Sequence, residues 1–290
     1  MIHPALGLGR LAGQHDGTHM QAPRSFDIEK FFERVQNSTT RVLMLDYDGT
    51  LAPFSNRMRD AMPYPGVVAA LDAIMEARHT RVVIVSGRWA KDLIPSIGLK
   101  LRPELWGSHG WERVRVDAYD EARVPAGALA LLTALNDWAP DIESLGGRIE
   151  RKPAGLAFHW RGLPIDQVDA IRDALAARWK SIPTSPEIVW HDFDGGVELR
   201  AAGRNKGDVV REVAREAGHD AAIAYLGDDF TDEDAFEAIP QEGAAVLVRA
   251  EFRPTAAQIW IKPPDELIEF LLRWHRLAGD QVAEERRDAE

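Results

Sequence analysis

Cysteine is absent from the 290-residue sequence. The chain therefore has no disulfide framework, no thiolate nucleophile and no zinc–sulfur site. No apolar run reaches the ~18 residues that a membrane-spanning helix requires, so we expect no membrane partner. The N-terminus also lacks the charged start and uninterrupted apolar stretch of a secretory signal. These absences favour a cytoplasmic location.

The sequence has fewer basic than acidic residues. Lysine and arginine total 35, against 46 aspartate and glutamate residues, and the formal net charge is −11. Nucleic acid is therefore not expected as a partner, because binding its phosphates requires a basic surface. An acidic protein with an anionic substrate has to concentrate its positive charge at one site. The pattern contains no heptad repeat and leaves the oligomeric state open.

The chain divides into an arm, a core in two parts and an insertion. Residues 1–24 are rich in glycine, histidine and proline without periodicity, which indicates a flexible N-terminal arm. Residues 25–119 and 203–290 alternate solidly apolar runs with helical stripes, which is the pattern of a doubly wound, Rossmann-like parallel sheet. In residues 120–202, by contrast, apolar and polar residues alternate along the strands, as in half-exposed sheets. We expect an α/β fold with an inserted α+β cap domain.

The stretch Arg41–Phe54, RVLMLDYDGTLAPF, carries the first chemical signal. Its apolar run Val42–Leu45 is typical of a strand buried on both faces. Asp46 and Asp48 follow and point to the same side, because side chains alternate along a strand. Gly49 permits a sharp turn that brings backbone N–H groups close. The two like charges repel, and a divalent cation relieves that repulsion.

Two later strand ends and one helix start carry further polar groups. The apolar run RVVIV ends on Ser86, and a strand near residues 221–226 ends on Asp228. Beside Asp46, Asp228 completes an oxygen-only site that suits Mg²⁺. Lys206 begins a helix, where it is placed to hold a phosphate together with Ser86. The plain alternatives are a surface lysine and an acidic helix start.

Four motifs, DYDGTL, SGR, NKG and GDDFTDEDAF, occur in the order used by the haloacid dehalogenase-like phosphatases. GSHG at 107–110, the insertion between the second and third motifs, and GDDFTDEDAF resemble the trehalose-6-phosphate phosphatases in particular. The resemblance covers roughly residues 40–275. It implies the same core and cap, and the same chemistry.

The resemblance also implies roles for individual residues. Asp46 corresponds to the nucleophile, and Asp48 to the acid that protonates the leaving sugar oxygen and later activates water. Asp46, the backbone carbonyl of Asp48, and Asp228 correspond to the ligands of Mg²⁺, with Asp232 acting directly or through water. The positions that correspond to phosphate-binding residues are Gly49, Thr50, Ser86, Gly87 and Lys206.

In the insertion, ERKPAGLAFHWR (150–161) and VELR (197–200) resemble that family's sugar-contacting strands. The implied substrate-binding residues are Glu150, Lys152, His159, Arg161 and Glu198. Ionic groups with several donors and acceptors suit a polyol, but these residues could equally form solvated cross-strand pairs. Arg88 and His109, in the core, either contact substrate or brace the hinge.

The resemblance therefore implies a Mg²⁺-dependent phosphatase that hydrolyses trehalose 6-phosphate through an aspartyl-phosphate. A first alternative is a phosphatase of another sugar phosphate, such as sucrose phosphate or a glycosyl-phosphoglycerate. A phosphomutase, which returns the phosphoryl group to the sugar, belongs to a different chemical class. A third alternative is a non-catalytic regulatory domain, because enzymes lend their folds to binding roles.

Overall fold

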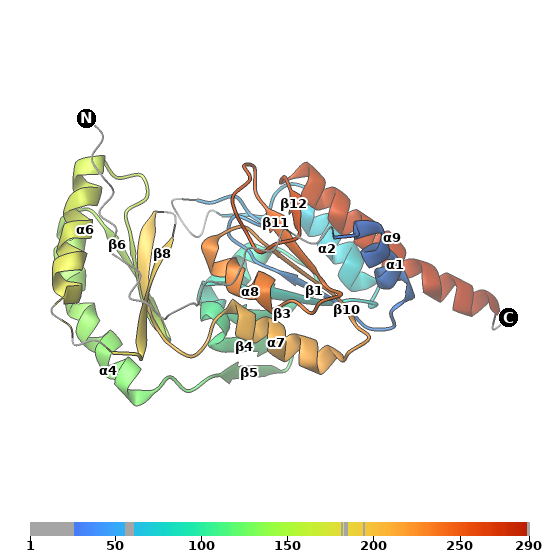
Figure 1. Ribbon diagram of the computed structural model, residues 1–290, viewed down its shortest axis with the longest axis horizontal. Coiled ribbons are helices and arrows are strands. Elements are labelled where there is room, and N and C mark those ends of the chain that lie inside the picture. The colour runs from blue at the N-terminus through green and yellow to red at the C-terminus, as the bar shows by residue number, and fades with distance from the viewer. Residues whose placement is uncertain (1–25, 56–60, 181, 183–184, 194, 289–290) are drawn as a thin grey trace.

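The computed structural model describes residues 26–55, 61–180, 182, 185–193 and 195–288. The predicted arm, residues 1–24, lies outside the described residues. Figure 1 shows two sheets along the long axis of the molecule, a large one surrounded by helices and a smaller one with its helices at one end. Within the described residues, no helix is both long enough and apolar enough to cross a membrane.

The large sheet has eight strands in the order β12-β11-β10-β1-β2-β3-β4-β5. The pairings from β12 to β3 are parallel, whereas β4 and β5 add an antiparallel hairpin at the β3 edge. The predicted doubly wound core is therefore confirmed, with a hairpin that the sequence analysis did not foresee. The strands are β1 Arg41–Leu45, β2 Arg81–Val85, β3 Glu104–Gly107, β4 Glu112–Arg115, β5 Ala118–Glu121, β10 Ala222–Gly227, β11 Ala244–Val248 and β12 Ile259–Ile261.

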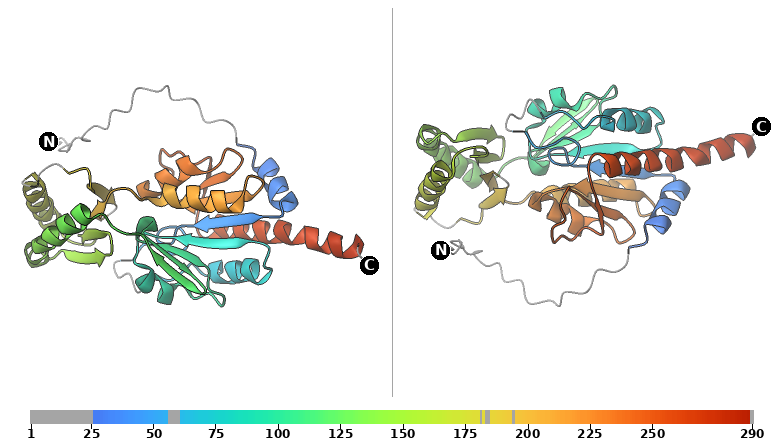
Figure 2. Two further views of the ribbon diagram at one scale, coloured as in Figure 1. Left: turned by 90° about the horizontal axis from the view of Figure 1, so that it is seen from below. Right: turned by 90° about the horizontal axis from the view of Figure 1, so that it is seen from above.

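Helices cover both faces of this sheet because its central strands are apolar on both faces. Leu43 and Leu45 of β1 pack among α1, α2, α3 and α9, whereas Val42 and Met44 pack against α7 and α8. Figure 2 shows α7 and α8 on one side of the sheet and α2 and α9 on the other. The helices are α1 Ile28–Asn37, α2 Val67–Glu76, α3 Ala90–Ile97, α7 Lys206–Ala217, α8 Glu233–Ala238 and α9 Asp265–Asp288.

The smaller sheet has the order β6-β7-β9-β8, and every pairing in it is antiparallel. One face carries Leu156, Phe158, Val197 and Leu199, which pack on helices α4, α5 and α6. The opposite face carries polar residues, Glu150, Lys152, Glu198 and Arg200. In Figure 1, the side of this sheet away from its helices lies toward the large sheet. The elements are α4 Ala126–Leu135, α5 Ala139–Ser144, β6 Arg148–Lys152, β7 Gly155–His159, α6 Ile165–Lys180, β8 Ile188–Phe193 and β9 Gly196–Ala201.

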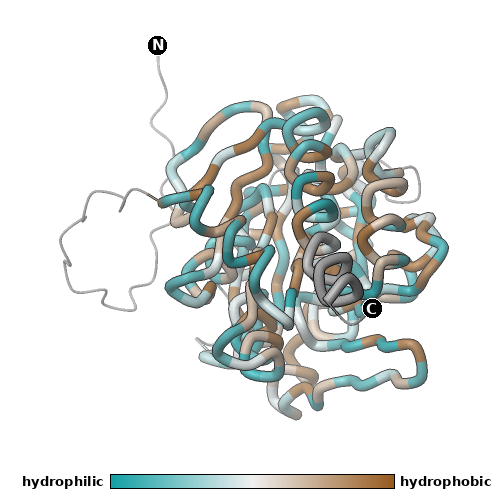
Figure 3. Tube along the Cα trace, turned by 90° about the vertical axis from the view of Figure 1, so that its right-hand side faces the viewer, coloured by the Kyte–Doolittle hydropathy of each residue, from teal (hydrophilic) through white to brown (hydrophobic). Residues whose placement is uncertain are grey.

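This second layer is the inserted α+β cap. Its boundaries at residues 120 and 202 stay a prediction, and β5 still pairs with β4 as far as Glu121. In Figure 3, hydrophobic and hydrophilic residues alternate along the chain, within individual helices as well as between elements. The alternation of residue types correctly indicated one apolar face and one polar face. The expectation of half-exposed strands is wrong for β7 and β9, which are buried almost throughout because the polar face lies against the core, where Glu198 meets His109.

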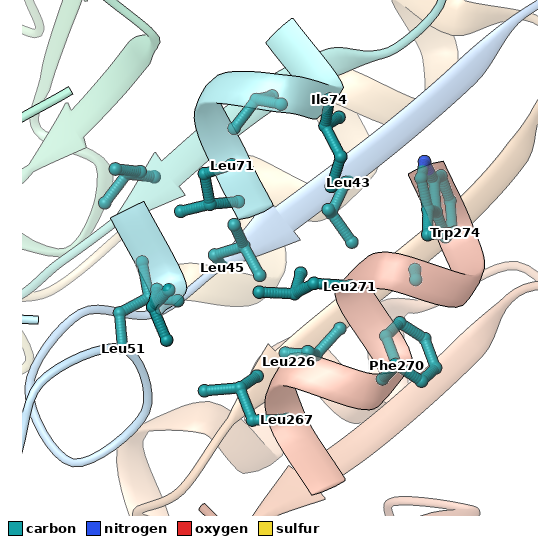
Figure 4. Packing of buried hydrophobic residues seen from close by; sticks show 14 of the residues in the cluster. Leu43, Leu45, Leu51, Leu71, Ile74, Leu226, Leu267, Phe270, Leu271 and Trp274 are labelled. Atoms are coloured by element: carbon teal, nitrogen blue, oxygen red, sulfur yellow. The ribbon is translucent and has the colours of Figure 1, made fainter. Parts of the chain in front are cut away.

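Helix α9 tests how far packing against the sheet stabilises the core. Leu271 is fully buried beside Leu43 and Leu45 (Figure 4), whereas the next residue, Leu272, is 49% exposed. Leu271→Ala should lower the free energy of unfolding by about 2–5 kcal/mol, because it loses apolar burial and leaves a cavity. Leu272→Ala should change it by less than ~0.5 kcal/mol. Urea denaturation followed by circular dichroism measures both, and equal losses would contradict this account of the core.

Candidate active site

The predicted catalytic, metal-binding and phosphate-binding residues gather at the carboxyl edge of the large sheet. Strands β1, β2, β3 and β10 are parallel neighbours, so the loops that follow them emerge together. Asp46 follows β1, Ser86 follows β2, and Asp228 follows β10. Lys206 comes from the first turn of α7, where Asn205 and Asp208 form a capping box that fixes the start of the helix.

Three carboxylates form a buried cluster at this edge. Asp46, Asp228 and Asp232 each bring one oxygen to within 4.8 Å of the others, and the residues are 4%, 2% and 0% exposed. Lys206, itself only 2% exposed, donates from Nζ to Asp46 Oδ1 at 2.7 Å and to Asp232 Oδ1 at 2.8 Å. The alternative of a surface lysine is therefore wrong.

The charge balance of this cluster is unfavourable for ionised acids. Burial raises the pKa of Asp46 to about 7, and Lys206 opposes the rise. Burial and the negative charge of Asp46 also raise the pKa of Asp228 well above its ordinary value. Burial alone would lower the pKa of Lys206, but Asp232 and Asp46 raise it well above its usual range. Three acids thus share one positive charge, and a divalent cation would correct the imbalance.

The donor set and the local backbone fit such a cation. All ligand atoms in the cluster are carboxylate oxygens, the type preferred by hard divalent ions. Gly49 has φ +89°, and a Cβ at this position would lie 2.1 Å from an Asp228 oxygen, so only glycine permits the approach of the two loops. The Thr50 hydroxyl lies 3.3 Å from Asp46 Oδ2 and 3.4 Å from Asp228 Oδ1.

Asp232 differs from the other two acids because its carboxylate already has many protein partners. Besides Lys206, its Oδ1 accepts from the Tyr225 hydroxyl at 2.6 Å. Its Oδ2 accepts the backbone N–H groups of Asp228 at 3.1 Å and Asp229 at 3.0 Å. Asp232 therefore orients the loop that carries Asp228.

The Asp48 carboxylate lies outside this cluster and faces Arg88. Arg88 donates from Nε to Asp48 Oδ2 at 2.6 Å and from Nη2 to Oδ1. The Ser86 hydroxyl oxygen accepts the backbone N–H of Arg88 at 3.1 Å, which fixes the loop after β2. A Cβ at Gly87 would lie 2.6 Å from His109 Nε2, so glycine is needed where these two loops meet.

His109 connects the core to the cap. It belongs to the short helix η2, Ser108–Gly110, and has φ +57°. Its Nε2 lies 2.9 Å from Glu198 Oε2 on β9. Burial lowers the pKa of His109 to about 4, so at neutral pH the uncharged ring donates Nε2–H to the carboxylate. Burial opposes ionisation of Glu198, but Lys152 lowers the pKa of this group well below its ordinary value.

The polar face of the cap continues this network. Lys152 Nζ donates to Glu198 Oε1 at 3.0 Å and lies 3.9 Å from Glu150 Oε2, which is 3.0 Å from His159 Nε2. The side chains of Glu150, Lys152 and Glu198 are 9%, 8% and 5% exposed, so the alternative of solvated cross-strand pairs is wrong for them. Arg161 stacks instead on Phe54 of the core, 4.6 Å from its ring centre.

Several polar atoms between cap and core have no partner. Among the described residues, His109 Nδ1, Glu150 Oε1 and Arg200 Nη1 are buried without a hydrogen bond. Such atoms are costly to bury unless something else satisfies them. They include two acceptors and one donor, which a ligand rich in hydroxyl groups can complement.

Glu112 on β4 is a buried acid beside the site that was not predicted from the sequence. It is fully buried and accepts from the Ser108 hydroxyl at 2.8 Å, the Tyr119 hydroxyl at 2.9 Å and the backbone N–H of Ala90 at 3.2 Å. Glu112 thus joins the loops that carry Arg88 and His109. The alternation in WERVRV, residues 111–116, was the signal that could have revealed its strand.

A doubly wound parallel core, acidic loops at its carboxyl edge and an inserted cap define a haloacid dehalogenase-like fold. A solved structure of a haloacid dehalogenase-like hydrolase from B. subtilis matches with a TM-score of 0.56 at 12% identity, over 82% of this chain and 98% of that one. The chain belongs to the trehalose-phosphatase family, because the model of that family matches residues 44–259.

Individual relatives agree with this family. The chain is similar to a trehalose-phosphate phosphatase of Mycobacterium marinum, with 32% identity over 246 residues, 79% of this chain and 60% of the relative. It thus spans about 60% of the length of that relative. Among solved structures, the C-terminal domain of C. albicans trehalose-6-phosphate phosphatase has a TM-score of 0.74 at 20% identity, covering 90% of this chain and 99% of that one. The Aspergillus fumigatus trehalose-6-phosphate phosphatase has a TM-score of 0.59 at 25% identity, covering 88% and 100%.

The raised pKa values of Asp46 and Asp228 predict a pH-dependent response to a cation. At about pH 6 the metal-free cluster holds protons that a cation has to displace, whereas at about pH 8 it holds fewer. Mg²⁺ should therefore raise the Tm more at about pH 8 than at about pH 6. Thermal unfolding with and without Mg²⁺ measures the difference.

Two variants control this measurement. Asp46→Asn should lose most of the Mg²⁺-induced rise in Tm, because it removes a candidate ligand and a titrating group. Asp120→Asn, at an exposed position on β5, should keep both the rise and its pH dependence. A rise in Tm that is equal at the two pH values, or larger at the lower one, would contradict the assignment of the cluster.

Proposed function

We propose that this protein is a Mg²⁺-dependent phosphatase that hydrolyses trehalose 6-phosphate to trehalose and phosphate in the cytoplasm. One observation carries the proposal: the buried group of acids around Lys206 lies at the core edge beneath a charged cap face with unpartnered polar atoms. The first feature suits a phosphoryl group and the second a polyol. Membership of the trehalose-phosphatase family supports the same substrate.

The chain's own residues suit the binding of metal and phosphate. Asp46, Asp228 and the backbone carbonyl of Asp48 would hold Mg²⁺, and Asp232 would orient them. When bound there, the ion would neutralise charge on the phosphoryl oxygens and so assist attack by an anion. Lys206 would add a second positive charge. The residues proposed to contact the phosphate are Gly49, Thr50, Ser86, Gly87 and Lys206.

The reaction we propose has two balanced steps. The Asp46 carboxylate attacks phosphorus, the bond from phosphorus to the sugar oxygen breaks, and Asp48 gives that oxygen a proton, which leaves trehalose and an aspartyl-phosphate. Asp48, now ionised, then takes a proton from water, whose oxygen attacks phosphorus. Cleavage of the bond to Asp46 releases phosphate and restores both aspartates.

Arg88 would regulate access to Asp48. Both oxygens of the Asp48 carboxylate accept hydrogen bonds from Arg88. The incoming sugar oxygen therefore has to displace at least one of these N–H groups before a proton can pass. Asp48 remains 27% exposed on its side chain, so a substrate can reach it.

The cap would select the sugar. Neutral His109 offers Nδ1 as an acceptor, Glu150 offers Oε1, and Arg200 offers an N–H group to hydroxyls of the sugar. Lys152 and Glu198, which join these residues, supply further charged contacts. We propose that His159 and Arg161 line the outer end of the same face. Burial of this network supports exclusion of water when the cap is closed.

A panel of phosphate esters tests the proposed substrate. With Mg²⁺ present, kcat/KM for phosphate release should be about tenfold or more higher for trehalose 6-phosphate than for sucrose phosphate, a glycosyl-phosphoglycerate or glucose 6-phosphate. Asp46→Asn should abolish release while leaving the circular dichroism spectrum unchanged. A preference for another ester would assign a different sugar phosphate. An isomerised sugar phosphate without free phosphate would indicate a mutase, and no turnover of any ester would leave a binding domain.

Substitution of Asp48 tests its role as proton donor. Asp48→Asn should lower kcat on trehalose 6-phosphate by roughly 100-fold or more, because the sugar alkoxide is a poor leaving group. The kcat of the same variant on an aryl phosphate should fall much less, because that leaving group needs no proton. Steady-state kinetics on both substrates provide the comparison, and equal losses would rule out Asp48 as the acid.

A further inference from the structure

Arg253, in the loop between β11 and β12, is buried against the acidic loop that follows β10. It is 8% exposed, and its guanidinium donates from Nε to the Asp228 carbonyl at 3.2 Å and from Nη2 to the Asp229 carbonyl at 2.7 Å. A third donor, Nη1, binds the Glu233 carboxylate. One side chain thus contacts three residues of the loop that carries the proposed metal ligand.

These contacts fix the peptide groups on both sides of Asp228. Its N–H donates to Asp232 Oδ2 at 3.1 Å, and its carbonyl accepts from Arg253. The carboxylate itself is held more loosely, because the Thr50 hydroxyl reaches it only at 3.4 Å and Lys206 is directed at Asp46 and Asp232. The position of the Asp228 carboxylate therefore depends on its backbone.

Arg253 is itself held in place from two sides. Glu233, its carboxylate partner, also accepts from the Thr255 hydroxyl at 2.8 Å and from the backbone N–H of Ala256 at 2.7 Å. The Phe230 ring lies 4.8 Å from the guanidinium and covers it. Glu233, at the start of α8, thus binds both Arg253 and the segment that follows it. The side chain of Arg253 therefore has little freedom to move.

The negative charge of the loop explains why a positively charged side chain such as Arg253 stabilises it. Five of the seven residues from 228 to 234 are acidic, so their carboxylates repel one another. Arg253 offsets that charge while contacting backbone oxygens, so the Asp228 carboxylate is left free for a metal. An arginine is suited to this role because its planar fork holds several acceptors at once.

We propose that Arg253 is a positioning residue that sets the affinity of the site for Mg²⁺ by fixing the backbone of Asp228. The inference rests on the proposed function, in which Asp228 binds the ion. Residues that orient metal ligands commonly change metal affinity by about 10- to 100-fold when they are substituted.

Titration calorimetry with Mg²⁺ alone, without substrate, tests the proposal on the full chain. Arg253→Gln should weaken binding by about 10- to 100-fold, and Arg253→Lys by less, because lysine keeps the charge but not the fork. Glu233→Gln, which weakens the anchor of Arg253, should also reduce affinity by less. Arg273→Gln is the matched control: Arg273 is a partly buried arginine on α9 that pairs with Glu29 and stacks on Phe32, away from the acidic loop.

Kinetics separate positioning from a general structural role. The Mg²⁺ concentration for half-maximal activity should rise in Arg253→Gln, while kcat at saturating Mg²⁺ returns to near the wild-type value. Wild-type affinity in Arg253→Gln and Glu233→Gln would overturn the inference and leave the proposed function intact. A loss of kcat that Mg²⁺ does not restore would also overturn it. Absence of Mg²⁺ binding in the wild type would overturn both proposals.

Discussion

The candidate site depends on the burial of three carboxylates, Asp46, Asp228 and Asp232, around Lys206. In water such groups would be ionised and apart, whereas here an apolar sheet with helices on both faces holds them together. The repulsion is reduced because burial raises the pKa values of Asp46 and Asp228, and because Asp232 accepts hydrogen bonds from donors such as the Tyr225 hydroxyl. In the proposed function, a divalent cation would complete this arrangement and a phosphoryl group would then approach it.

The two sheets position the residues of the candidate site in different ways. The parallel sheet brings distant residues to one edge, because every strand from β12 to β3 runs in the same direction. The antiparallel cap sheet needs no such edge and offers a face instead, on which charged side chains lie in rows across the strands. His109 and Glu198 join the edge to the face, so the proposed chemistry and the proposed choice of ligand would meet at one contact.

Residue pattern predicted the elements better than their contacts. The solid apolar runs before Asp46 and Ser86 were predicted as strands buried on both faces, and β1 and β2 confirm this. The alternation around Leu156 and Phe158 correctly separated the two faces of the cap. The short β4–β5 hairpin was missed although residues 111–116 alternate, because a four-residue strand shows that alternation over only two residues on each face. Because β4 was not predicted, Glu112 was not recognised as a buried residue either.

The contacts inside the site could not be read from the sequence. The pairing of Arg88 with Asp48 spans 40 residues, and that of His109 with Glu198 spans 89, so each depends on how whole elements pack. The role of Arg253 likewise required the loop after β11 to be placed against the loop after β10. Motif order indicates which residues matter, whereas only the folded chain determines which atoms face one another.

The unpartnered atoms between cap and core have a consequence for selectivity. Among the described residues, His109 Nδ1, Glu150 Oε1 and Arg200 Nη1 are buried without a hydrogen-bond partner in the chain, which is unfavourable unless a ligand or water satisfies them. If the proposed sugar phosphate binds here, a ligand that lacks a hydroxyl at the matching position would leave the same penalty in the complex, and wrong sugars would be rejected because they fail to satisfy these atoms. Discrimination of this kind needs no steric clash, and it strengthens as the cap excludes more water.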